Sequence, residues 1–114
     1  MISHWRIFTD TKTAEKALRL HAKLMERTTL ICKEPTAAAY HKGGHTVEFT
    51  LEHSAPDWPQ LVFDVLCVAQ QLGYGWHLGS FVAEELDLWS TGCSVPGVSN
   101  IHVFAPGPGT QYGE

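Results

Sequence analysis

The segment 45–53 constrains the fold of this chain most strongly, because apolar and polar residues alternate along it. Val47, Phe49 and Leu51 fall on one side, and the residues between them are polar or charged. Successive side chains of a strand point to opposite faces, so the pattern predicts a strand with one buried and one wet face. The preceding Gly43-Gly44 pair permits the positive φ angles of a tight hairpin turn. The chain is therefore expected to form an antiparallel sheet that is open to solvent on one side.

Two helices are predicted by apolar residues that recur every three or four positions. The first spans residues 12–27, with Asp10 or Thr11 as its N-cap and lysines and arginines on its outer side. The second spans residues 58–72, with Asp57 as its cap and no charge of its own except Asp64. Since most of its positions are apolar, we expect the second helix to be more deeply covered than the first.

Further strands are expected where β-branched and aromatic residues gather. They are residues 4–9, residues 28–41 with an interruption at Pro35, residues 76–81 with a bulge at Gly79, and residues 100–104. Residues 82–89 either continue the strand 76–81 or cover the sheet, and residues 91–99 form a loop. The order strand, helix, strand, strand, helix, strand, with an extra C-terminal strand, is that of an α+β, ferredoxin-like βαββαβ sandwich with an antiparallel sheet and two helices on one face. A simpler meander with two helices is the competing topology. Residues 1–104 are expected to form one domain, and residues 105–114 a flexible C-terminal tail.

Charge is distributed unevenly along the chain, since all eight lysines and arginines lie within the first 42 residues. The remaining residues carry carboxylates only, which disfavours a nucleic-acid partner because phosphates are neutralised by Lys and Arg. No apolar run is long enough for a membrane helix and the N-terminal segment lacks a signal-peptide core, so a cytoplasmic protein without a membrane partner is expected. The three cysteines form no CxxC pair, which argues against a disulfide framework and a zinc ribbon.

Histidine and cysteine chemistry is not strongly indicated. His41 and His45 form the tightest histidine pair, but they flank the glycine turn and lack further ligands, so we expect no metal and no cofactor. His21 lies on the apolar side of the first helix, where a hydrogen-bonded structural residue is expected. No phosphate-binding loop or nucleophile elbow is present in the sequence. Catalysis is therefore possible, but nothing in the sequence requires it.

The candidate functional residues are carboxylates followed by an aromatic residue. They are Glu84, Glu85, Asp87 and Trp89, together with Glu48 and Glu52 on the polar side of the alternating strand. Because no lysine or arginine follows position 42, we expect these acids to form an uncompensated acidic surface. The competing interpretation is a solvated acidic edge that deters strand-to-strand aggregation.

Two short segments, 75–80 (GWHLGS) and 95–103 (VPGVSNIHV), resemble those of small immunity proteins encoded beside bacterial polymorphic toxins of Rhs, contact-dependent and type VI secretion systems. The resemblance implies a non-enzymatic protein that binds a cognate toxin and blocks its active site or substrate groove. Trp89 and Trp58 are the candidate anchors for such an interface. A different class remains open, a ferredoxin-like ligand-binding protein or enzyme with a pocket lined by His77, His102 and Cys93. A homodimer is compatible with both the immunity protein and the ligand-binding protein or enzyme.

Overall fold

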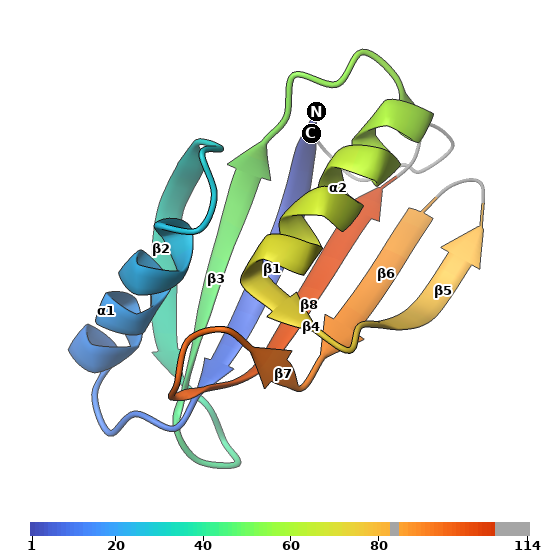
Figure 1. Cartoon of the computed structure of the whole chain (residues 1–114). Helices are drawn as coiled ribbons and strands as arrows, with labels where there is room; N and C mark the ends of the chain where they lie inside the picture. The colour runs from blue at the N-terminus through green and yellow to red at the C-terminus, as the bar shows by residue number, and fades with distance from the viewer. Residues whose placement is uncertain (83–84, 107–114) are drawn as a thin grey trace.

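Two helices lie on one face of a six-stranded antiparallel sheet in the computed structural model of the chain, which describes residues 1–82 and 85–106, with the backbone alone for 80–82 (Figure 1). The elements are β1 (Ile2–Thr9), α1 (Ala14–Met25), β2 (Cys32–Ala39), β3 (His45–Glu52), α2 (Trp58–Leu72), β4 (Gly73–Tyr74), β5 (His77–Val82), β6 (Glu85–Ser90), β7 (Gly92–Cys93) and β8 (Val98–Pro106). The α+β class and the ferredoxin-like arrangement are thus confirmed.

The strand order is β2-β3-β1-β8-β6-β5, so the strand that follows all others in the chain lies inside the sheet. β8 pairs with β1 on one side and β6 on the other, and it takes the place of the fourth strand of the ferredoxin-like pattern. The β5–β6 hairpin is the addition, and it extends the sheet beyond β8. An interior position suits β8 because Ile101, Val103 and Ala105 are fully buried.

The segment after α2 forms a hairpin of two strands. The sequence allowed two other interpretations of residues 82–89, a continuation of the strand 76–81 and a segment that covers the sheet. β5 and β6 pair antiparallel, and their register shifts between Leu78 and Ser80, which confirms the bulge at Gly79. The expected interruption of β2 is also present, as a register shift between Lys33 and Thr36 around the proline. β8 reaches Pro106, two residues into the expected tail, and the rest of that tail lies outside the described residues.

The helix boundaries follow from their caps. Asp57 caps α2 as expected, because its carboxylate accepts the backbone N–H of Gln60 at 3.0 Å. The expected cap of α1 at Asp10 or Thr11 is wrong, since Thr13 accepts the backbone N–H of Lys16 at 3.2 Å. The Thr11 hydroxyl bonds to that of Thr9 instead, and a bond from the Asp10 N–H to the Gly97 carbonyl holds the backbone there to the neighbouring loop, so the helix begins only after both residues.

The core lies between the helices and the inner face of the sheet. Val47, Phe49 and Leu51 are buried there, which confirms the register predicted for β3. Glu48 and Glu52 project from the opposite face, which no helix covers (Figure 1). Neither helix within 1–82 and 85–106 combines the length and apolarity needed to cross a membrane.

Candidate functional site: the open face of the sheet

The open face of the sheet carries five of the six candidate residues. Leu86, Leu88 and Ser90 are buried on β6, so the alternating residues Glu85, Asp87 and Trp89 lie on the opposite, open face. Glu48 and Glu52 lie on the same face, at β3. Glu84 lies outside the described residues.

The acids do not form one continuous patch, because β1 and β8 separate β3 from β6. The strand pairing places a row of polar and aromatic side chains across the whole face. From β5 to β2 that row reads His77, Trp89, His102, Arg6, Glu48 and Thr36. Cross-strand neighbours on one face are close enough to interact, so the centre of the open face is occupied by a histidine and an arginine.

The predicted lack of charge compensation is wrong for Glu48 and Glu52, because their cationic partners come from other strands. Arg6 Nε donates to Glu48 Oε1 at 3.0 Å, and Lys33 Nζ lies 2.9 Å from Glu52 Oε1. The Asp87 carboxylate bonds to the ring of His102. Exposed pairs of this kind contribute only about 0–1 kcal/mol each to stability, but Arg6 and Lys33 neutralise the charge of Glu48 and Glu52.

The two halves of the face nevertheless differ in charge. Arg6 and Lys33 compensate the acids on β3, whereas no lysine or arginine belongs to β5, β6 or β8. The partner of Asp87 is a histidine, which is not a permanent cation. The β6 half of the open face is therefore its acidic half.

A hollow of about 450 Å³ lies on the open face over the start of β8. Phe8 and Tyr40, whose rings meet edge to face at 5.2 Å, line it together with Trp89 from β6. Its other lining residues are Lys42, Asn100, Ile101 and His102. Phe8, Tyr40 and Asn100 were not predicted from the sequence, although the alternation along β1 places Phe8 on the face away from the buried Ile7.

Trp89 is the aromatic side chain most available to a partner at this hollow. Its indole is 44% exposed and stacks on the ring of His77 with centroids 4.4 Å apart. Trp58, the other candidate anchor, packs half-buried against the core at the start of α2. The structure therefore separates the two tryptophans into a surface residue and a core residue.

The pocket expected from His77, His102 and Cys93 does not form. The two histidines lie on the open face on either side of Trp89. Cys93 lies in β7, packs against the core and contacts the Leu72 carbonyl, and burial raises the pKa of its thiol. Within the described ranges no three His, Cys, Asp or Glu side chains are placed to hold a metal ion.

The strongest polar cluster lies beneath α2 and was not anticipated from the sequence. Trp5 Nε1 donates to Ser3 Oγ at 2.7 Å, Ser3 Oγ lies 2.6 Å from His53 Nε2, and His53 Nδ1 lies 2.8 Å from Asp64 Oδ2. The Asp64 carboxylate can only accept, so the imidazole donates its Nδ1–H to it, and the Ser3 hydroxyl, which can donate and accept at once, bridges the Trp5 indole and His53 Nε2. No local pattern signals a contact among residues so far apart in sequence.

This cluster resembles a serine–histidine–aspartate arrangement in connectivity, but its geometry suits structure and not nucleophilic attack. Ser3 and the His53 side chain are fully buried, so no substrate can reach the hydroxyl. The chain of bonds ties the sheet to α2, because Ser3 belongs to β1 and Asp64 to the helix. It satisfies buried polar groups that would otherwise cost about 1–3 kcal/mol each.

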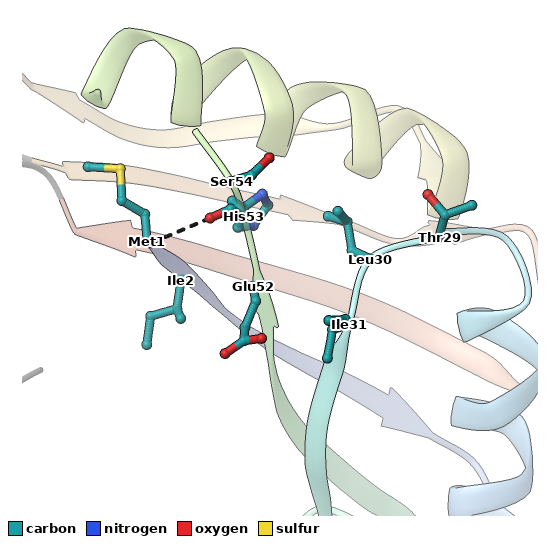
Figure 2. A pocket seen from close by; sticks show the side chains of 8 residues that line it. All are labelled: Met1, Ile2, Thr29, Leu30, Ile31, Glu52, His53 and Ser54. Atoms are coloured by element: carbon teal, nitrogen blue, oxygen red, sulfur yellow. Dashed lines mark hydrogen bonds between the residues drawn. The ribbon is translucent and has the colours of Figure 1, made fainter. Parts of the chain in front are cut away.

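A second hollow, also about 450 Å³, adjoins this cluster where β1 begins and β3 ends (Figure 2). Its lining residues are Met1, Ile2, Thr29, Leu30, Ile31, Glu52, His53 and Ser54. Ile2, Ile31 and Glu52 point away from α2, whereas Thr29, Leu30 and Ser54 point towards it (Figure 2). Because these side chains diverge, the hollow lacks convergent polar groups of the kind that orient a ligand.

No protein-family model matches the chain, and neither a curated protein nor a solved structure matches it.

Proposed function

We propose that this chain is an immunity protein, which binds a cognate bacterial toxin through the open face of the sheet and blocks its active site or substrate groove. The observation that carries the proposal is the exposed Trp89, held against His77 at the rim of the hollow. The resemblance of segments 75–80 and 95–103 to immunity proteins supports the same assignment. Inhibition is stoichiometric in this proposal, and the chain transforms no substrate.

Trp89 has the properties of an interface anchor. Tryptophan, tyrosine and arginine are enriched among residues that dominate binding energy, and Trp89 lies in one face with Tyr40 and Arg6. Burying the exposed 44% of the indole against a partner contributes about 2–3 kcal/mol from its apolar area. The stack on His77 restricts the ring before binding, so less side-chain entropy is lost in the complex.

Charge supports a basic toxin surface on the β6 half of the open face. Glu85 and Asp87 lie there without a lysine or arginine on β5, β6 or β8, and the whole chain carries a formal net charge of −4. Complementary charge raises the association rate more than the affinity, whereas a buried aromatic anchor mainly lowers the dissociation rate. The acids and Trp89 are therefore assigned different kinetic roles.

The test is to co-express the chain with the toxin encoded by the neighbouring gene, and to measure cell survival and binding kinetics. Trp89→Ala should raise the dissociation rate by about 30-fold or more, which follows from the loss of about 2 kcal/mol. Replacing Glu85 and Asp87 by Lys should slow association and reduce its dependence on salt. Tyr74→Ala is the matched control, because Tyr74 is an exposed aromatic residue in β4, outside the six-stranded sheet.

Each outcome bears on the proposal. Survival and kinetics that are unchanged by both open-face variants would remove this face from the mechanism. Failure of the unaltered chain to bind or protect would overturn the immunity assignment itself. Protection at a small fraction of the toxin concentration would favour an enzyme, because occlusion requires equal amounts.

A further inference from the structure

The hollow on the open face has the composition of a small-molecule site. Pockets for small ligands combine mostly apolar walls with a few polar groups in volumes of roughly 300–1,000 Å³, and this hollow measures about 450 Å³. Its walls include the aromatic rings of Phe8, Tyr40 and Trp89. Its polar lining residues are Lys42, Asn100 and His102. The hollow therefore offers both stacking surfaces and polar contacts to a ligand.

The aromatic rings of the hollow lie on both sides of β8. Phe8 of β1 is paired opposite Asn100, and Trp89 of β6 is paired opposite His102. Asn100 and His102 are two positions apart on β8, so both belong to the open face and lie between two aromatic walls. Tyr40 extends the wall at Phe8 through the edge-to-face contact of their rings. A planar ring suits this arrangement, because aromatic groups are stabilised by stacked and edge-to-face contacts.

One face of the Trp89 indole is available for stacking. The ring of His77 covers the other face, with centroids 4.4 Å apart and planes 18° apart. β6 lies between β5, which carries His77, and β8, over which the hollow lies. The uncovered face of the indole is therefore turned towards the hollow, in agreement with the 44% exposure of Trp89.

Charge determines the sign of the ligand. Lys42 is the only lysine or arginine among the described lining residues, and none of them is a carboxylate. Within residues 1–82 and 85–106, Lys42 forms no ion pair, so its charge is not compensated there. Asp87 lies beside the lining through its bond to His102, and it repels a second negative charge. A single negative charge, as in a carboxylate, suits the hollow better than a doubly charged phosphate.

We infer that this hollow binds an aromatic carboxylate, which is a small molecule with a planar ring and one negative charge. The ring lies between Trp89 and the Phe8–Tyr40 pair, and the carboxylate bonds to Lys42. The side-chain amide of Asn100 can donate to the same carboxylate. The ligand needs no toxin, so its binding does not depend on the proposed function. A ligand in the hollow covers Trp89, however, and so competes with any partner that uses this indole as an anchor.

The test titrates the ¹⁵N-labelled chain with indole-3-acetate at pH 7 and follows the tryptophan indole N–H signals by NMR. The Trp89 signal should shift, because the ring of the ligand stacks on that indole. The indoles of Trp5 and Trp76 donate to Ser3 and to the Ala69 carbonyl, so they are internal controls that should not shift. We expect a dissociation constant of about 1 mM or below, which is typical of a ligand with about 13 non-hydrogen atoms.

Two comparisons separate the contribution of the charge from that of the ring. Indole-3-acetamide has the same ring and size without the charge, and it should bind roughly 5-fold more weakly than indole-3-acetate. Lys42→Met should weaken binding of the acetate by a similar factor and leave binding of the acetamide unchanged. Lys16→Met is the matched control, because it removes the same charge from the exposed side of α1 and should change neither affinity.

Trp89→Ala should weaken binding of both compounds at least about 10-fold, measured from the backbone amide signals, whereas Tyr74→Ala outside the six-stranded sheet should not. The same spectra verify that each variant is folded. A Trp89 signal that stays unshifted up to about 10 mM indole-3-acetate would overturn the inference. Equal affinities for the acetate and the acetamide, or equal effects of Lys42→Met and Lys16→Met, would refute the contact with the carboxylate. Undiminished binding by the Trp89→Ala variant would place the ligand elsewhere and reject this hollow.

Discussion

Acid should destabilise this protein through His21, a histidine on the inner side of α1. Its side chain is 5% exposed, its ring meets that of Phe49 at 4.5 Å, and its Nε2 lies 3.5 Å from the Cys32 sulfur. Burial lowers the pKa of His21 from 6.5 to about 4, because the charged imidazolium is poorly solvated there. This agrees with the structural, hydrogen-bonded role expected from the sequence.

The sign and size of the effect follow from proton linkage. Above pH 6.5 the imidazole is neutral in both states, and stability is unaffected. As the pH falls from 6.5 towards 4, the unfolded chain binds a proton that the folded chain does not, so stability is lost. The loss is about 2 kcal/mol between pH 7 and pH 5, and about 3 kcal/mol once both states are protonated.

Urea unfolding followed by tryptophan fluorescence at pH 7 and pH 5 measures this loss. The midpoint of the unaltered chain should fall by roughly 1–2 M from this residue. His21→Leu should remove that part of the pH dependence, whereas Cys32→Ala should retain it, because the variant keeps the buried imidazole. The reasoning is refuted if His21→Leu and the unaltered chain lose the same free energy of unfolding between the two pH values.

Two further predictions concern single contacts in the fold. Asp64→Ala should lower the free energy of unfolding, measured in urea, by about 2–3 kcal/mol, because it leaves the Nδ1–H of the buried His53 without an acceptor. A decrease of less than about 0.5 kcal/mol would show that this hydrogen bond contributes nothing to stability. Gly44→Ala should lower the midpoint of thermal unfolding more than Gly43→Ala does. A Cβ at Gly44 would lie 2.0 Å from the Thr9 carbonyl oxygen, whereas the space around Gly43 is open. Equal decreases in the two midpoints would contradict this. Both glycines have positive φ angles, so that shared strain, about 1 kcal/mol, cancels in the comparison.

Local features of the fold could be predicted because they depend on neighbouring residues. The alternation around Phe49 identified the buried face of β3, and Asp57 identified the start of α2. The place of β8 between β1 and β6 could not be predicted, because periodicity shows that a strand exists but not which strand it pairs with. The cap of α1 was misplaced for a similar reason, since Asp10 is held by the distant Gly97.

The candidate site was predicted in part. Alternation was enough to place Glu48, Glu52, Asp87 and Trp89 on one open face. Their pairing with cations depends on register between strands, and no pattern along the chain reports that Arg6 lies opposite Glu48. The hollow beside Trp89 likewise needs segments that only the folded sheet brings together.

Because β8 lies inside the sheet, the sheet cannot be completed until the ribosome has synthesised this strand. β8 joins the β2-β3-β1 half of the sheet to the β5–β6 hairpin, and it follows every other described element in the chain. While residues 98–106 of a nascent chain are still inside the ribosome, one edge of β1 and one edge of β6 remain unpaired. Unpaired edges invite pairing with other chains, so premature termination before residue 98 should yield aggregates and not a smaller folded protein. Complementation with a separate peptide of residues 98–106 would then restore the missing strand.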